Sequence, residues 1–330
     1  MLLCCLVPLQ AQAQPAPAAA TTETDTNTDG AAHPSPEQDA SQPAADFFSF
    51  LDAPQQSISS GIESVVRSVD TFFSNEPANY PSSGSYVRYT VQSLFEEGGR
   101  TTTVGNLDIS LRLPRTEKKL RLIVESDPVE KQTNLERATT GTTQDSQNNL
   151  YAGLQSELGK QNKWQFKPSL GLRLRSPIDY YLRLRAFRNF NFNKWNLQLT
   201  ESAYWFHSTG SGFDSQMQWN RLLSKNLLFR ANSLVRHTQE YKRFDLSQIF
   251  YLIHSFSDRR AITYSIGFFG NSEPQLHATD YILQARYRQI IHSDYLFMEL
   301  VPQIRYRIDY AFTEEDSFML RFEWLFKSNH

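Results

Sequence analysis

Strict alternation of apolar and polar residues is the feature that most constrains this chain. From Tyr80 almost to the C-terminus, apolar side chains recur at every second position, in segments separated by turn-type residues. In 295–310, one set of alternate positions is mainly Leu, Met, Ile and Tyr, and the other is mainly Glu, Gln, Arg and Asp. Because successive side chains of a strand point to opposite faces, this pattern predicts strands with one apolar and one charged face.

Turn residues divide this region into fourteen predicted strands. An even number is typical of single-chain bacterial barrels, although merging the weak first segments would make twelve. The one long connection, 127–147, would then lie at the outer end and the short turns at the periplasmic end, as is usual for such barrels. The predicted strands are 85–97, 103–113, 118–127, 148–160, 162–176, 179–189, 194–207, 212–223, 226–238, 241–256, 260–270, 277–290, 295–310 and 317–326.

A soluble β-barrel or sandwich is the strongest rival, because it also alternates between apolar and polar positions. A barrel of about eight strands fills its interior with side chains, whereas twelve or fourteen strands enclose a space too wide to fill. Aromatic residues make up 13% of the chain and gather near strand ends, where membrane barrels have aromatic girdles. We therefore predict an all-β fold, a transmembrane antiparallel up-and-down barrel over 85–327 that contacts lipid.

The last predicted strand contains Phe322, Trp324 and Phe326 at alternate positions. This motif resembles the terminal signal of bacterial outer-membrane β-barrel proteins, which their assembly machinery recognises. Arg321 and the four residues after Phe326 depart from it. Residues 85–326 also resemble uncharacterised proteobacterial outer-membrane proteins, particularly in Leu-Arg-Leu-Pro-Arg-Thr-Glu at 111–117 and Arg-Leu-Ile-Val-Glu-Ser-Asp at 121–127. The resemblance implies location in the outer membrane and identifies no activity.

The N-terminal part has a different composition. Residues 1–13 are apolar and end in Ala11-Gln12-Ala13, the small-x-small form of a signal-peptide cleavage site. The chain's two cysteines, Cys4 and Cys5, lie within it, so the mature protein would have no thiols. Residues 14–55 contain few large apolar side chains and no Lys or Arg, which predicts a disordered acidic linker.

A helical pattern follows in residues 56–76. Its apolar residues recur at three- and four-residue spacing, which predicts an amphipathic helix. These are Ile58, Ile62, Val65, Val66, Val69, Phe72 and Phe73. The helix could enter the barrel as a plug, lie in the periplasm, or contact a periplasmic partner.

Two sets of charged residues are expected to face the lumen if the apolar face meets lipid. The first, a basic wall, consists of Lys167, Arg173, Arg175, Arg183 and Arg185, with only Asp179 nearby in sequence. Such a wall would attract anions, or, with equal weight, its cations would pair with acids from loops and stiffen the wall. The second, a salt-bridge network, consists of Arg286, Arg288, Arg305, Arg307, Glu299, Asp309 and Glu323.

These features favour a passive, weakly anion-selective pore or an envelope structural component. The alternative is a plugged barrel that scaffolds a periplasmic partner. An outer-membrane hydrolase is less expected, because no catalytic motif surrounds the candidates His207, Ser208, His237 and His277. No catalytic residue, cofactor or metal is predicted, since His-x-x-x-His pairs and Gly-rich phosphate loops are missing from the sequence. Nucleic acid is not an expected partner, because charged and aromatic residues lie mostly on opposite faces of the strands.

Overall fold

The computed structural model describes residues 58–73, 85–113, 120–126, 128, 130–139, 150–161, 164–174, 176–308 and 311–328. Contacts divide the chain into two units, 1–42 and 43–330, and all described residues belong to the second. The predicted signal peptide 1–13 and linker 14–55 lie outside the described residues. The predicted helix is present as α1 (Ile58–Phe73).

The described residues form fifteen strand segments that occupy fourteen positions in one antiparallel sheet. β4 and β5 both pair with β6 and are separated only by Glu157, so they act as one interrupted strand. The prediction of fourteen strands is therefore confirmed, and twelve is wrong. The segments are β1 (Ser85–Glu96), β2 (Thr101–Arg112), β3 (Leu120–Glu125), β4 (Tyr151–Ser156), β5 (Leu158–Gln161), β6 (Trp164–Arg173), β7 (Tyr180–Phe192), β8 (Trp195–Phe206), β9 (Gly210–Ser224), β10 (Leu227–Thr238), β11 (Phe244–Ser257), β12 (Arg260–Asn271), β13 (His277–His292), β14 (Leu296–Arg307) and β15 (Thr313–Ser328).

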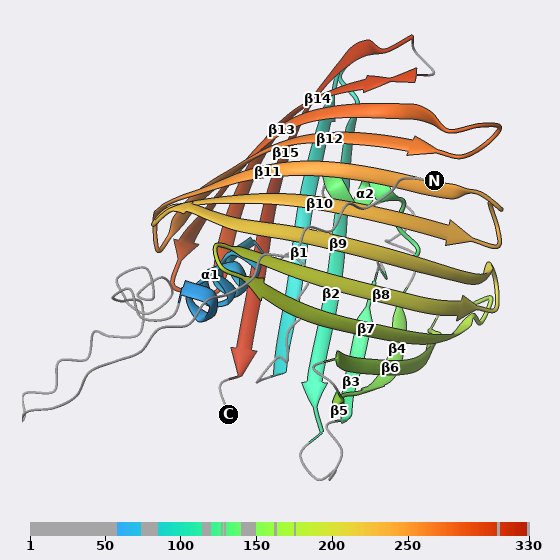
Figure 1. Cartoon of the computed structure of the whole chain (residues 1–330). Coiled ribbons are helices and arrows are strands. Elements are labelled where there is room, and N and C mark those ends of the chain that lie inside the picture. The colour runs from blue at the N-terminus through green and yellow to red at the C-terminus, as the bar shows by residue number, and fades with distance from the viewer. Residues whose placement is uncertain are drawn as a thin grey trace, which may run out of the picture. The chain divides into compact units, whose positions relative to one another are not determined.

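The sheet closes on itself. Neighbouring strands pair in sequence order, and β1 pairs with β15 from Ser85↔Ser328 to Glu96↔Ser317. Figure 1 shows these strands wrapping around to form one continuous wall. Closure gives each of the fourteen strand positions a hydrogen-bonded neighbour on both sides, which a strand needs in order to cross hydrocarbon.

The outer face of the barrel is apolar and the inner face is charged. On β7, Leu182 and Leu184 are 58% and 44% exposed, whereas the alternating Arg183 and Arg185 are 3% and 6% exposed. Large exposed apolar side chains also occur on β6, β11, β12 and β15, which makes a broad apolar belt. Such a belt needs lipid around it, so the soluble alternative is wrong. No helix in the described ranges is long and apolar enough to cross a membrane.

The two ends of the barrel differ in their connections. At the end where β1 begins and β15 finishes, called here the terminal end, the turns after β7, β9, β11 and β13 have only two or three residues. The long connection between β3 and β4 lies at the opposite end and contains the short helix α2 (Asn134–Thr139). Short turns at the terminal end are typical of the periplasmic side, as the sequence predicts.

The proposed assembly signal lies on the outer face of β15. Phe326 is exposed, and the Trp324 ring lies 5.7 Å from the ring of Tyr89 on the paired strand β1. Phe322 and Trp324 also contact each other, with ring centroids 6.5 Å apart. Trp324 therefore contacts β1 across the closing seam of the barrel. Recognition of the three aromatic residues by the assembly machinery stays a prediction.

Candidate functional site in the lumen

The first element of the lumen is α1, which packs against the inner wall at the terminal end. Ile62, Val65, Val66, Val69, Phe72 and Phe73 are buried against Leu228, Ile253, Ala261, Ile290, Phe297 and Leu325. Along their strands, these wall residues lie an even number of positions from buried lumen charges such as Arg230 and Glu299. They therefore point to the same, inner face of the barrel. The helix therefore covers an apolar collar inside the barrel, and its apolar face is not available to a periplasmic partner in this state (Figure 1).

Polar contacts complete the docking of α1. The guanidinium of Arg230 lies 2.6 Å from Asp70 Oδ1. Asn189 and Asn191 on β7 each donate to the Glu63 carboxylate at 3.4 Å. Burying six large apolar side chains stabilises the docked helix by on the order of 10 kcal/mol, as an upper estimate. Spontaneous departure of α1 is therefore rare.

The second element is the segment 130–139, which folds into the lumen from the opposite end. A capping box begins α2, since Thr133 and Glu136 exchange backbone-to-side-chain hydrogen bonds of 2.6 and 3.2 Å. Leu135 and Ala138 pack against an apolar cluster on the inner wall. That cluster consists of Ile249, Phe269 and Ile282. The segment is thus attached to the wall by an apolar face as well as by charges.

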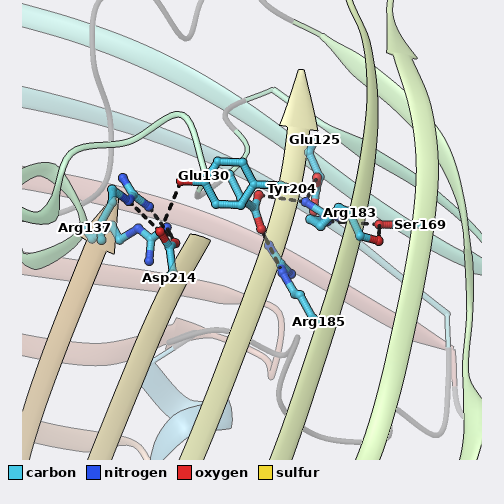
Figure 2. Close-up of polar contacts among 9 residues, drawn as sticks. Glu125, Glu130, Arg137, Ser169, Arg183, Arg185, Tyr204 and Asp214 are labelled. Carbon is cyan, nitrogen blue, oxygen red and sulfur yellow. Dashed lines mark hydrogen bonds and ion pairs between the residues drawn. The ribbon is translucent and has the colours of Figure 1, made fainter. Parts of the chain in front are cut away.

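The carboxylate of Glu130 is the centre of the basic wall. Arg185 donates to Oε1 from Nε at 2.9 Å and from Nη2 at 2.5 Å, and Arg183 Nη1 donates to Oε2 at 2.9 Å (Figure 2). Arg183 also donates to Glu125 at 3.1 Å and to the Ser169 hydroxyl at 3.0 Å. The sequence left open whether the cations of the basic wall attract anions or pair with acids from loops. In the structure, Arg183 and Arg185 are paired with acids.

The other members of the predicted basic wall are more dispersed. Lys167 Nζ lies 3.9 Å from Glu157 and over the Phe187 ring. Arg173 donates to the Pro177 carbonyl in the connection after β6, and Arg175 lies outside the described residues. Among the predicted members that the structure describes, Arg183, Arg185 and Lys167 therefore form a continuous wall.

Asp179 does not neutralise that wall. It accepts hydrogen bonds from the Ser208 hydroxyl at 2.7 Å and from the Tyr151 hydroxyl at 3.1 Å. Its cationic partner is Lys131 at 3.6 Å, which also donates to the hydroxyls of Ser208 and Thr209. Burial acts to raise the pKa of Asp179, but these hydrogen bonds and Lys131 hold it below its ordinary value.

A further cation of the inserted segment, Arg137, pairs with Asp214 at 2.5 Å. Asp214 lies on β9 and also accepts from Arg236 Nε and Nη2 at 2.8 Å, and Arg236 in turn donates to the Gln132 carbonyl. Residues 130–137 thus present an acid to the arginines of β7 and two cations to Asp179 and Asp214. The segment docks by reciprocal charge complementarity.

The electrostatics of Glu130 follow from this geometry. Burial alone raises the pKa of a carboxyl group. In Glu130 the guanidinium groups of Arg183 and Arg185 outweigh that effect and lower the pKa from 4.5 to about 2. The side chain is therefore an anion at any pH above that value.

The second predicted network is present but is smaller than expected. Arg288 donates to Glu299 at 2.6 Å and to Glu323 at 2.9 Å, and all three side chains are almost completely buried. The sequence interpretation missed Arg321, which bonds to Glu299 at 3.4 Å and to Gln92 at 2.7 Å. We call these residues, Gln92, Arg288, Glu299, Arg321 and Glu323, the seam network, because they join β1 to the last three strands.

The remaining predicted members lie apart from the seam network. Arg305 pairs with Asp280 at 2.5 Å, and Arg307 pairs with Glu315 at 2.8 Å, both towards the outer ends of their strands. Arg286 is buried on β13, and Asp309 lies outside the described residues. The prediction that these charges form one network is corrected to several separate pairs. Arg305 and Arg307 lie six and eight positions from Glu299 along β14, and therefore at a different depth in the barrel.

Beside α1, the wall formed by β8 and β9 carries a ladder of amides that the sequence interpretation did not identify. Gln218 donates to Gln198 at 2.9 Å, and Asn220 donates to Asn196 at 3.3 Å. Arg230 donates to Asn220 at 2.7 Å. The ladder is a neutral polar lining, and amides at alternate positions of β8 and β9 are the sequence signal that could have revealed it.

The histidines considered for hydrolysis are engaged in ring stacking or turn contacts. His207 stacks on Tyr180 at 4.7 Å, and His237 stacks on Phe213 at 5.6 Å. The His277 ring nitrogen lies 2.8 Å from the Gln275 carbonyl. No group of three or more metal-binding side chains occurs within the described residues.

A closed ring of fourteen strands with an apolar exterior and a charged lumen defines the chain as a transmembrane β-barrel of the bacterial outer membrane. No family model and no curated protein matches its sequence. Its fold is similar to that of a KdgM porin, with 7% identity, a TM-score of 0.37, and coverage of 74% of this chain and 99% of that one.

Two further solved structures are similar at the same level. For the outer-membrane channel DcaP of Acinetobacter baumannii the identity is 9% and the TM-score 0.41, with 74% of this chain and 96% of that one covered. For OmpT of Vibrio cholerae the identity is 6% and the TM-score 0.42, with 75% of this chain and 99% of that one covered. Similarity this distant carries no information about a ligand, and it indicates no catalytic family.

Proposed function

We propose that the protein is a passive pore of the outer membrane whose lumen is occluded in the resting state. The observation that carries this proposal is the position of α1, whose residues Val66, Phe72 and Phe73 are buried inside the ring of strands rather than beneath it. Segment 130–139 narrows the lumen from the other end. Because both inserts are part of this chain, opening requires one or both of them to move.

The ion preference of the open pore is expected to be weak and towards anions. Arg183 and Arg185 are paired with Glu125 and Glu130, so the basic wall has a much smaller field than its cations alone would produce. Residual preference arises because Arg121 and Lys167 share the single carboxylate of Glu157.

Planar-bilayer recordings of Val66→Asp and Ser64→Asp test the occlusion. Both variants introduce the same charge on the same helix, but Val66 is buried against the wall and Ser64 is exposed. We expect low conductance in the parent protein and in Ser64→Asp, and a several-fold higher conductance in Val66→Asp, because a buried aspartate without a partner undocks the helix.

Equal conductance in the parent protein and both variants would contradict the plug. Absence of any conductance steps, with each variant folded by heat-modifiable gel mobility, would contradict the pore and favour a purely structural envelope role. Reversal potentials in a salt gradient give the ion preference of the conducting variant in the same recordings.

A further inference from the structure

Arg183 and Arg185 converge on a single carboxylate group. They lie two positions apart on β7, both face the lumen, and both are buried. Together they donate three hydrogen bonds of 2.5 to 2.9 Å to the two oxygens of Glu130. Planar guanidinium groups arranged in this way are a typical recognition site for a carboxylate.

The carboxylate that fills this site does not belong to the wall. Glu125, the other acid at Arg183, is a residue of β3, whereas Glu130 lies in the connection between β3 and β4. Figure 2 shows Glu130 reaching towards Arg183 and Arg185 from outside their strand. The barrel wall therefore forms a two-arginine anion site, and a tethered side chain occupies it.

The site also has unused hydrogen-bonding capacity. Arg183 Nη2 is buried and has no hydrogen-bond partner among the described residues. Glu130 engages Arg183 only through Nη1, and the Ser169 hydroxyl accepts from Nε. A carboxylate not constrained by the loop backbone can use Nη1 and Nη2 of Arg183 together, which Glu130 does not.

We propose that Arg183 and Arg185 form a binding site for solutes that bear a carboxylate group, and that Glu130 is a tethered competitor that occupies this site in the resting pore. The inference deepens the proposed function, because the pore is the route by which a solute reaches the site. Binding of such a solute displaces Glu130 and thereby weakens the docking of segment 130–139, which Leu135, Ala138 and the Arg137–Asp214 pair also hold.

The strength of the competition follows from the tether. A side chain on a short flexible linker competes at an effective concentration on the order of millimolar, and the contacts of Lys131, Leu135 and Arg137 hold Glu130 in place and raise this value. A simple carboxylate therefore needs a higher concentration in the parent protein than in a variant without Glu130. The expected difference in the half-saturating concentration is about tenfold or more.

The experiment compares the heat-unfolding midpoint of the full chain, followed by gel mobility, in sodium acetate and in sodium chloride of equal ionic strength. The variants are Glu130→Ala, Glu130→Gln and, as a matched control, Glu315→Ala, which removes the carboxylate from a wall pair with Arg307. We expect acetate, relative to chloride, to raise the midpoint of Glu130→Ala at low concentration. The parent protein and Glu315→Ala should need about ten times more acetate or show no shift.

Identical midpoints of Glu130→Ala in acetate and chloride overturn the inference. If that variant does not fold, Glu130→Gln is measured in the same way, because it keeps the size of the side chain and removes its charge. Hydrogen exchange of residues 130–139 in the parent protein provides a third measurement. Faster exchange in acetate than in chloride supports displacement of Glu130, and equal exchange contradicts it.

These results separate the inference from the function on which it rests. An acetate-specific midpoint shift in Glu130→Ala, with no conductance in any folded variant, would retain the carboxylate site and remove the pore. Conductance of Val66→Asp without an acetate-specific shift would retain the pore and remove the site.

Discussion

The buried ion pairs at Arg183 and at Arg288 differ in where their carboxylates come from. Both partners of Arg288, Glu299 and Glu323, lie on neighbouring strands, so the ladder hydrogen bonds of the sheet hold all three groups in position. Arg183 has one strand partner and one partner, Glu130, from a long connection. The first arrangement is part of the wall, whereas the second forms only when the connection folds inward.

The comparison shows how one type of interaction can serve two purposes. Removing one partner of a buried ion pair leaves an uncompensated charge, so a pair between strands strongly penalises any separation of those strands. In the seam network this penalty protects the junction of β1 with β15, through Arg321 and Gln92. In the basic wall, the inserted segment can leave without breaking a ladder hydrogen bond, so the same chemistry is suited to a movable element.

Breaking the seam network is expected to have the largest effect. Arg288→Met leaves Glu299 and Glu323 buried without their main cation and should destabilise the barrel by about 3–5 kcal/mol. The measurement is the unfolding midpoint in heat or urea, followed by gel mobility. Arg259→Met is the matched control, because its partner Asp294 is exposed and 3.8 Å away. A midpoint for Arg288→Met equal to that of the control would show that the network is not structural.

Lowering the pH should weaken the docking of segment 130–139, with an effect smaller than that of Arg288→Met. The folded-state pKa of Glu130, about 2, lies below the ordinary 4.5, so its contribution is fully present above the ordinary value and declines as the pH falls towards 2. At pH 3 the loss is about 1–2 kcal/mol. Hydrogen exchange of residues 130–139, corrected for its intrinsic pH dependence, measures this change. Glu130→Gln should lose less protection over the same range, and the remaining loss comes from Asp179, which holds Lys131 and also has a lowered pKa.

A loss of protection between pH 7 and 5 would contradict this assignment, because a group with a lowered pKa does not titrate there. It would indicate that the docked segment depends on a different titrating group. The comparison with the seam network would then no longer rest on Glu130.

Removing an exposed pair should have the smallest effect and defines the baseline for the comparison. The Glu96 carboxylate, at the end of β1, lies 2.8 Å from Nε of Arg100 in the connection to β2. The Arg100 side chain is 74% exposed. Glu96→Ala should change the free energy of unfolding by about 0–1 kcal/mol, because water screens exposed pairs. The same gel-mobility assay measures it. A shift of the unfolding midpoint as large as that of Arg288→Met would mean that buried ion pairs do not stabilise the barrel more than exposed ones.

Much of the fold could be predicted from the sequence because strand alternation is local. The predicted strand 226–238 is found at Leu227–Thr238, and the predicted 194–207 is found at Trp195–Phe206. Errors occur at ends, where the alternating pattern weakens. The last strand begins at Thr313 rather than 317, since polar residues there still pair with β14.

The candidate site was only partly predictable. Arg183 and Arg185 could be assigned to the lumen from their leucine neighbours, but Glu130 is 53 residues from Arg183 in a connection with no periodic pattern. Arg321 looked like a departure from the terminal aromatic motif, whereas in the barrel it bonds to Glu299. An acid close to two cations, Lys131 and Arg137, was the available signal for an inward-folded segment.

By itself the sequence determined which side chains meet lipid and which face the lumen, because that choice depends only on the two-residue period of each strand and on the length of the meander. Tertiary structure alone decided that α1 lies inside the terminal end and that Glu130, rather than Asp179, meets the arginines of β7. Those contacts depend on ring closure and on an inward fold of the long connection. Closure brings together residues that no local pattern relates.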